Sequence, residues 1–320
     1  MQKILVTGAA GQFGSELTIA LREKYGNENV IATGHTKNPD EHLRESGPFQ
    51  FIDCSVINTV ADIVKKYKVG TIYHLAAILS AVAEENPQRA WEVNMIGLYN
   101  ILEVARSYKC SVFTPSSIGA FGPTTPLNNT PQDTIQRPNT IYGVTKVAGE
   151  LLCDYYFKRF GVDTRGVRYP GIISYKTLPG GGTTDYAVEI YYEAIKHKKY
   201  TSYLNRGTYL DMMYMPDAMK AAIDLMETNP DKLQHRNAFN VTAMSVAPEN
   251  IADEIRKIIP EFLLDFKIDP LRQAIADSWP NNMDDSAARQ EWGWEPEYNL
   301  ESMTKDMIER LSQKLGKEAG

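Results

Sequence analysis

The stretch KILVTGAAGQFG, residues 3–14, decides the fold. It opens with a short apolar run, Lys3–Thr7, whose β-branched residues favour a strand. A helical pattern follows over Ser15–Lys24. Glycines recur at every third position between the two, namely Gly8, Gly11 and Gly14. A strand, a glycine turn and a helix in this order form the start of a βαβ unit.

The alternation of strands and helices continues to about residue 170. Further strands are expected at Asn29–Thr33, Phe49–Asp53, Thr71–Leu75, Ser111–Pro115 and Asp163–Tyr169. Helices are expected at Val56–Tyr67, Pro87–Tyr108 and Asn139–Phe160. This pattern predicts an α/β fold with a Rossmann-type, doubly wound parallel sheet.

The glycine turn can be interpreted as a binding site or as a purely structural turn. Glycines let the backbone turn tightly and approach a pyrophosphate, and the following helix offers free amides and a positive dipole end. In this strand–turn–helix context the turn is predicted to bind a dinucleotide. The alternative is an ordinary tight turn.

The regular pattern loosens after Pro170. Residues 178–184 form a glycine-rich loop, and a strand-like run returns at Ala238–Thr242. We expect residues 1–170 to form the dinucleotide-binding domain, rejoined by a strand near residues 236–242. Residues 171–320 are expected to form a smaller, interleaved lobe that binds the substrate.

Composition narrows the class of protein. The chain has 320 residues, of which 43% are hydrophobic and 23% charged, and carries a net charge of −6. It has no basic stripe, so nucleic acid is not expected as a partner. Its apolar runs are too short for a membrane span, and the first strand leaves no room for a leader peptide. Three scattered cysteines and few histidines predict a cytoplasmic protein without a metal site.

The stretch TIYGVTKVAGE, residues 140–150, places Tyr142 and Lys146 one helical turn apart on one face. The pKa of a free phenol is about 10. A neighbouring ammonium favours the ionised phenol, so the pair can form a proton acceptor. The alternative is a chance pair on a surface helix.

Small or polar residues follow three neighbouring strands of the expected sheet. Ser116 and Ser117 follow one strand, residues 75–80 follow a second, and Pro170 follows a third. Ligands of such sheets bind beyond the carboxyl ends of the strands. A single crevice that holds a Ser–Tyr–Lys set is therefore predicted.

The end of the second strand leaves the choice of cofactor open. An NAD site usually has an acid there to hold the ribose. This chain has Gly34 and His35 instead, and His35 and Lys37 could meet a 2′-phosphate. Asp53, which closes the third strand, is predicted to contact the adenine amino group or to cap the helix that begins at Val56.

In order and spacing, these features resemble the extended short-chain dehydrogenase/reductase family over the first half of the chain. The resemblance implies that Tyr142 is the acid/base and that Ser117 polarises the substrate. It implies that Lys146 binds the nicotinamide ribose and that Asn94 supports a proton-relay water. Ser116 would lie nearer the cofactor. The implied cofactor contacts are Gly8, Gly11, Gln12, Phe13, Gly14, His35, Asp53, Cys54, Leu75, Ala76, Ala77, Asn94, Ser116, Tyr142, Lys146, Tyr169 and Pro170.

Longer stretches resemble the short-chain L-threonine 3-dehydrogenases over nearly the full length. They are YHLAAILSA, PSSIGAFG, YGVTK, RYPGIIS, LPGGGTTDYA, MMYMPD and SWPNNMDDSAAR. The resemblance implies oxidation of the L-threonine β-hydroxyl by NAD to 2-amino-3-oxobutyrate, although that family carries an acid where this chain has Gly34. The implied substrate residues are Ser80, Ser117, Tyr142, Gly181, Thr183, Thr184 and Trp279.

Two other functions remain open from the residues alone. One is a nucleotide-sugar epimerase or dehydratase of the same family, and the other is a non-catalytic dinucleotide-binding regulator. The helices at Pro87–Tyr108 and Asn139–Phe160 resemble those that pair in dimers of the family, so a homodimer is expected.

Overall fold

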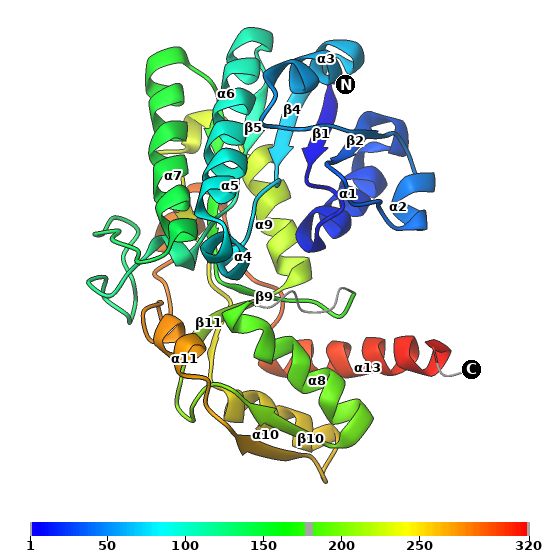
Figure 1. Cartoon of the computed structure of the whole chain (residues 1–320), viewed down its shortest axis with the longest axis vertical. Helices are drawn as coiled ribbons and strands as arrows, with labels where there is room; N and C mark the ends of the chain where they lie inside the picture. Colours follow the sequence, from blue (N-terminus) through cyan, green and yellow to red (C-terminus); the bar gives the residue numbers. More distant parts are fainter. Residues whose placement is uncertain (1, 177–181, 319–320) are drawn as a thin grey trace.

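The computed structural model describes residues 2–176 and 182–318. A six-stranded parallel sheet in the order β3-β2-β1-β4-β5-β7 lies at the centre of its N-terminal part (Figure 1). The strands are β1 (Lys3–Thr7), β2 (Val30–Gly34), β3 (Phe49–Phe51), β4 (Val69–His74), β5 (Ser111–Phe113) and β7 (Thr164–Arg165). The predicted Rossmann-type fold class is confirmed.

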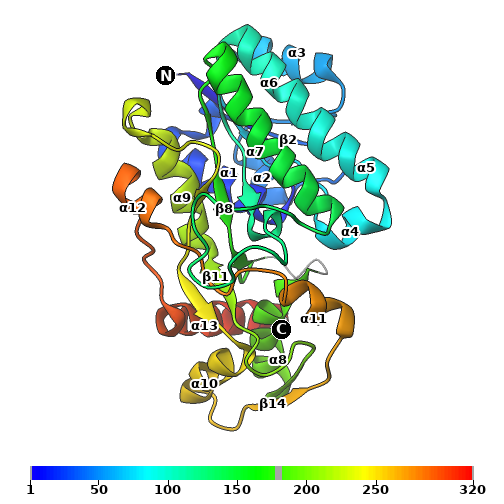
Figure 2. The same cartoon turned by 90° about the vertical axis from the view of Figure 1, so that its left-hand side faces the viewer.

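Helices cover both faces of this sheet (Figures 1 and 2). They are α1 (Gln12–Tyr25), α2 (Glu41–Glu45), α3 (Ile57–Tyr67), α6 (Gly97–Tyr108), α7 (Ile141–Phe160) and α9 (Met215–Glu227). The short helices α4 (Ser80–Glu85) and α5 (Pro87–Trp91) pack against α7. Alternate residues of β1 explain the two layers, because successive side chains of a strand point to opposite faces. Leu5 packs in the buried cluster with α3 and α6, whereas Ile4 and Val6 pack in the cluster with α1 and α9.

The predicted strand at Asp163–Tyr169 is divided in two. Its first part is β7, and its second part, β8 (Val167–Tyr169), pairs with β6 (Ser116–Ser117) and β12 (Phe239–Asn240). The division falls at Gly166, where an added Cβ would lie 2.4 Å from the carbonyl oxygen of Thr114. The backbones approach so closely here that only glycine fits.

The predicted helix at Pro87–Tyr108 is also interrupted. A π-helical turn at Glu92–Ile96 separates α5 from α6 and contains Asn94. Such turns insert one residue into the helical ladder and are frequent at functional sites. The sequence did not predict α4, the short helix that begins at Ser80.

The C-terminal part is built on two small sheets. One joins β9 (Gly171–Ile173), β11 (Leu210–Tyr214) and β13 (Met244–Val246), and the other joins β10 (Lys199–Ser202) and β14 (Leu263–Phe266). Its helices are α8 (Tyr186–His197), α10 (Pro248–Ile258), α11 (Pro270–Ala276) and α13 (Leu300–Glu318). The helix α12 (Ser286–Trp292) instead packs against β12 and the cluster that contains α1 and α9. Where the two parts divide, at residue 170 or elsewhere, stays a prediction.

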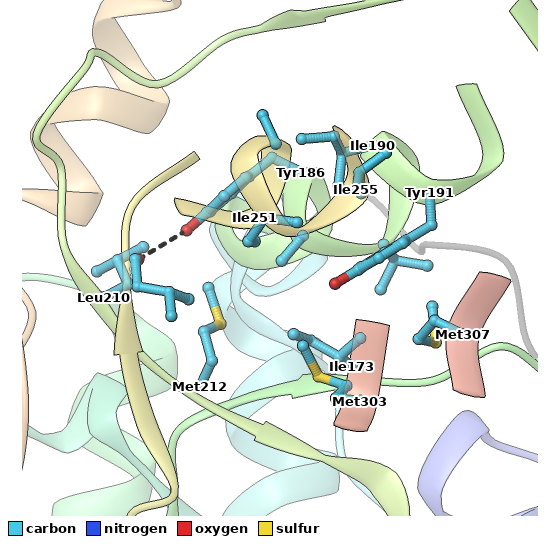
Figure 3. Packing of buried hydrophobic residues seen from close by; sticks show 14 of the residues in the cluster. Ile173, Tyr186, Ile190, Tyr191, Leu210, Met212, Ile251, Ile255, Met303 and Met307 are labelled. Carbon is cyan, nitrogen blue, oxygen red and sulfur yellow. Dashed lines mark hydrogen bonds between the residues drawn. The ribbon is translucent and has the colours of Figure 1, made fainter. Parts of the chain in front are cut away.

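A separate hydrophobic core holds the C-terminal part together (Figure 3). Ile173, Met212 and Met303 come from three elements distant in the sequence and pack beside α8. The Tyr186 hydroxyl donates a hydrogen bond of 3.3 Å to the carbonyl of Val246, so this buried phenol is satisfied. Among the helices that the structure describes, none has the length and apolar character that a membrane span needs.

Candidate active site

The glycine turn between β1 and α1 packs tightly against the end of β4. Gly8 has a positive φ of 69°, and an added Cβ would lie 2.7 Å from the amide nitrogen of Ala76. A Cβ on Gly14 would lie 2.2 Å from the carbonyl oxygen of Gly8. Side chains are therefore excluded at both positions. The turn leaves the N-terminal amides of α1 available to an anionic group.

A buried hydrogen bond fixes the ends of β1 and β4 beside this turn. The Thr7 hydroxyl lies 2.8 Å from Nδ1 of His74. The amides of Leu75 and Ala76 donate to the same hydroxyl oxygen, at 3.2 and 3.4 Å. Because two amides donate to the Thr7 oxygen, the Thr7 hydroxyl donates its own proton to Nδ1 of His74. This nitrogen can accept only when the imidazole is neutral. Burial, with the charge of Lys146, lowers the pKa of His74 to about 3.

The helix α7 begins at the predicted Tyr–Lys pair. The Thr140 side chain caps it by accepting a hydrogen bond of 3.0 Å from the amide of Gly143. Tyr142 is 8% exposed, and the Lys146 ammonium lies 5.4 Å from the centre of its ring. That ammonium donates to the carbonyl of Pro115 at 2.7 Å, just before β6. The pair therefore faces the carboxyl edge of the sheet.

Ser117 lies beside Tyr142. Both approach Gly119, because an added Cβ there would lie 3.1 Å from the Tyr142 ring and 3.5 Å from Oγ of Ser117. In the described part of the chain, the Tyr142 hydroxyl has no hydrogen-bond partner. The Ser117 oxygen accepts one bond of 3.1 Å, from the Gly119 amide. Both hydroxyls can therefore bind a substrate oxygen.

Asn94 connects this pair to the segment after β4. Its amide exchanges two hydrogen bonds with the backbone of Ile78, at 2.8 and 3.0 Å. It also donates to the Thr145 hydroxyl at 3.2 Å, and Thr145 in turn donates to the carbonyl of Tyr142. The Asn94 side chain therefore makes three hydrogen bonds within the protein. One of its partners, Thr145, directly precedes Lys146 in α7.

At the ends of β2 and β3, His35 and Asp53 lie close to each other. His35 lies 3.5 Å from the Asp53 carboxylate. Asp53 also accepts from the amide and hydroxyl of Ser55, and that hydrogen bonding, against some burial, lowers the pKa of Asp53. The alternative that Asp53 caps the next helix is wrong, since α3 begins at Ile57 without a side-chain cap.

The comparison with known protein families now decides the family. A sequence profile described as the NAD dependent epimerase/dehydratase family matches residues 4–242. The chain belongs to the NAD dependent epimerase/dehydratase family. This match confirms the expectation of NAD as the cofactor. The chain is therefore an enzyme of that family.

The similarity to known proteins extends over 98% of this chain. The structure of L-threonine dehydrogenase from Clostridium difficile is 60% identical, with a TM-score of 0.97 and 98% of each chain covered. That of L-threonine dehydrogenase from Phytophthora infestans is 47% identical, with a TM-score of 0.93, and covers 98% of this chain and 100% of the other. An uncharacterized epimerase/dehydratase of Staphylococcus haemolyticus is 55% identical over 98% of this chain and 99% of its own length. The resemblance to L-threonine 3-dehydrogenases is confirmed.

The glycine turn fits the NAD of this epimerase/dehydratase family. The backbone there excludes side chains, and predicted cofactor residues come together around it. Phe13 stacks edge-on against Tyr169 with ring centres 5.3 Å apart, which links the turn to β8 and Pro170. Cys54, which follows Asp53 in the sequence, is buried, and burial raises the pKa of its thiol to about 12. The individual contacts of these residues with NAD stay predictions.

The predicted substrate residues come from separate elements, and their contacts with a substrate stay predictions. Ser80 begins α4, which packs against α7. Thr184 lies against Gly171, where an added Cβ would be 2.9 Å from its methyl group. Trp279 is buried in the hydrophobic cluster that also contains Ile118 and Phe121. Thr183 is buried one residue before Thr184, and Gly181 lies outside the described residues.

Sequence reasoning missed several residues that shape the site. Ser116 was predicted to lie near the cofactor, but its hydroxyl donates to the Glu150 carboxylate. Glu150 stands one turn beyond Lys146, a spacing that could have drawn attention to it. Thr145 and His74 gave no such signal, since their partners Asn94 and Thr7 are distant in the sequence.

Proposed function

We propose that this enzyme oxidises the β-hydroxyl of L-threonine to 2-amino-3-oxobutyrate with NAD. The observation that carries the proposal is the full-length similarity to proteins named L-threonine dehydrogenase. That similarity includes the C-terminal part, which differs most among enzymes that share a cofactor-binding fold. The pairing of Ser117 with Tyr142, which both approach Gly119, supports it independently.

The side chains of the site have the chemistry that this oxidation needs. Tyr142 takes the proton from the substrate hydroxyl as general base. Ser117 binds the same oxygen and holds the C3–H bond in one orientation. The Lys146 ammonium places a positive charge 5.4 Å from the Tyr142 ring centre. NAD, when bound at the glycine turn, accepts the hydrogen that leaves C3 with its electron pair.

The amino-acid substrate would lie between the two parts of the chain. Its hydroxyl would face Ser117 and Tyr142, and its charged end would face α4 and the segment that holds Thr183 and Thr184. Asn94 maintains the backbone of Ile78 and so supports the start of α4 through the segment between them. Trp279 would close the pocket from the C-terminal side.

The direct test is substrate-dependent reduction of NAD. We expect absorbance of reduced nicotinamide to rise with L-threonine, less with L-serine, and not with UDP-glucose. Tyr142→Phe serves as the control, because it removes only the phenolic oxygen. No reduction with L-threonine, together with epimerisation of a nucleotide sugar, would replace the proposal by the alternative within the family.

We further infer that two copies pair through α6 and α7. The two helices lie side by side in Figures 1 and 2. Val144, Leu151 and Tyr155 share one face of α7 and are 41%, 63% and 52% exposed. Ile96, which ends the π-helical turn before α6, and Tyr99 of α6 are 42% and 46% exposed, so an apolar surface spans both helices. Light scattering should report a dimer that Leu151→Glu converts to a monomer, whereas a monomeric wild type would contradict this inference.

The three cysteines, Cys54, Cys110 and Cys153, are buried and unpaired. Free thiols are typical of a reducing compartment. We therefore place the proposed activity in the cytoplasm.

A further inference from the structure

A third residue shares the face of α7 that carries Tyr142 and Lys146. Glu150 follows Lys146 by four positions and therefore lies one turn further along the same face. Its side chain is only 6% exposed. A buried carboxylate is costly unless it is paired and hydrogen-bonded, so its partners are informative.

The Glu150 carboxylate binds two neighbouring strands at once. Oε1 accepts a hydrogen bond from the Ser116 hydroxyl of β6. The Arg168 guanidinium of β8 donates to both carboxylate oxygens, at 2.8 Å from Nη2 and 3.1 Å from Nε. Ser116 and Arg168 are also directly opposite each other in the pairing of β6 with β8. Gln136 completes the shell at 2.9 Å.

Arg168 is held equally firmly on its other side. Its Nη1 donates to the carbonyl of Gln132 at 2.8 Å and to the side chain of Asn240 at 3.1 Å. The guanidinium is 6% exposed, like the carboxylate. Buried ion pairs contribute little net stability because both charges lose water. Their value here is geometric, since each partner has a single position that satisfies it.

We propose that Glu150 is a positioning residue for the reacting set. Ser117 directly follows Ser116 on β6, and Tyr142 precedes Glu150 on α7. The contact between Glu150 and Ser116 therefore sets the separation of the Ser117 and Tyr142 hydroxyls. A displacement of about 1 Å in such a pair can cost about 100-fold in rate. The inference rests on the proposed function for its kinetic effect but not for its geometry.

The test uses three variants of this contact and one matched control. Ser116→Ala removes the hydroxyl, Ser116→Thr retains it, and Glu150→Gln removes the charge at nearly constant shape. Asp154→Asn is the control, because Asp154 lies one turn beyond Glu150 on α7 and accepts from Asn237 at 3.1 Å, away from β6. The measurements are kcat, KM for NAD and for L-threonine, the primary deuterium isotope effect with C3-deuterated L-threonine, and thermal unfolding.

A positioning role predicts a particular pattern. Glu150→Gln should lower kcat by about tenfold or more per folded enzyme and raise the isotope effect, with KM for NAD changed by less than about threefold. Ser116→Ala should show a smaller loss, Ser116→Thr should recover part of that loss, and Asp154→Asn should stay near wild type. A purely structural role would lower the melting temperature and leave kcat and the isotope effect of the folded enzyme unchanged.

Crystal structures of wild type and Ser116→Ala separate this inference from the proposed function. We expect the Ser117 and Tyr142 hydroxyls to move apart or become disordered in the variant. An unchanged separation would overturn the inference, whether or not the wild type oxidises L-threonine. Unchanged kcat and isotope effect in folded Glu150→Gln, or an equal loss in Asp154→Asn, would overturn it as well.

Discussion

Acid should destabilise the protein through one buried histidine beside the cofactor turn. His74 is 4% exposed, and burial followed by the charge of Lys146 lowers its pKa from 6.5 to about 3. Below pH 6.5 the unfolded chain therefore binds a proton that the folded chain does not, so stability falls as the pH falls. Proton linkage between these two pKa values gives a loss of about 2 kcal/mol between pH 7 and pH 5.

The variant His74→Asn isolates this contribution. An asparagine oxygen can accept from Thr7 as Nδ1 does, at 2.8 Å in the wild type, but it does not titrate. The smaller side chain will lower stability by an amount that does not depend on pH. Other buried acids, such as Glu16 and Asp211, have raised pKa values and are common to both proteins, so they cancel in the difference.

The assay is urea unfolding of both proteins at half-unit steps from pH 7 to pH 5. The free energy of unfolding of wild type should fall by about 2 kcal/mol more than that of His74→Asn over this range. His42→Asn, a change at an exposed position of α2, should follow the wild-type curve. Parallel curves for wild type and His74→Asn would refute the reasoning.

Three further outcomes concern the proposed chemistry. Tyr142→Phe should lower kcat by about 10²–10⁴-fold while unfolding at the same temperature, because in the described part of the chain its hydroxyl has no partner to lose; near wild-type turnover would exclude Tyr142 as the base. Lys146→Met should lower kcat and raise KM for NAD, because it removes the positive charge that lies 5.4 Å from the Tyr142 ring centre; unchanged values of both would exclude Lys146 from the site. The preference for NAD over NADP, measured as the ratio of kcat/KM values, should be modest, because the missing acid forgoes a charged hydrogen bond of about 1.5–3 kcal/mol. Gly34→Asp should sharpen that preference once the Phe49 ring, 3.1 Å from a Cβ built there, has shifted; strong discrimination that this change leaves untouched would mean that another group reads the ribose.

The fold was predictable because its decisive features are local. Gly8 needs a positive φ, and the residues around it alternate between strand and helix over short distances. The spacing of Tyr142 and Lys146 likewise follows from helix geometry alone. The rule that ligands bind beyond the carboxyl ends of parallel strands was enough to place Ser117 near this pair.

Features that depend on contacts between distant segments were not predictable. Gly166 divides a strand because the Thr114 backbone lies against it. The sequence around Gly166 does not predict this contact. The π-helical turn at Asn94 accompanies hydrogen bonds to Ile78, which is 16 residues away. Ser116 is a suitable residue for a cofactor site by its position, but the buried carboxylate of Glu150 occupies its hydroxyl.

The central claim is that this chain takes a hydrogen from C3 of L-threonine and that NAD receives it directly. The most direct measurement is the mass of the reduced nicotinamide formed from NAD and C3-deuterated L-threonine in ordinary water. We predict that every reduced nicotinamide carries one deuterium, and that none forms with Tyr142→Phe on the same time scale. Reduced nicotinamide without deuterium, or no threonine-dependent reduction at all, would contradict the claim.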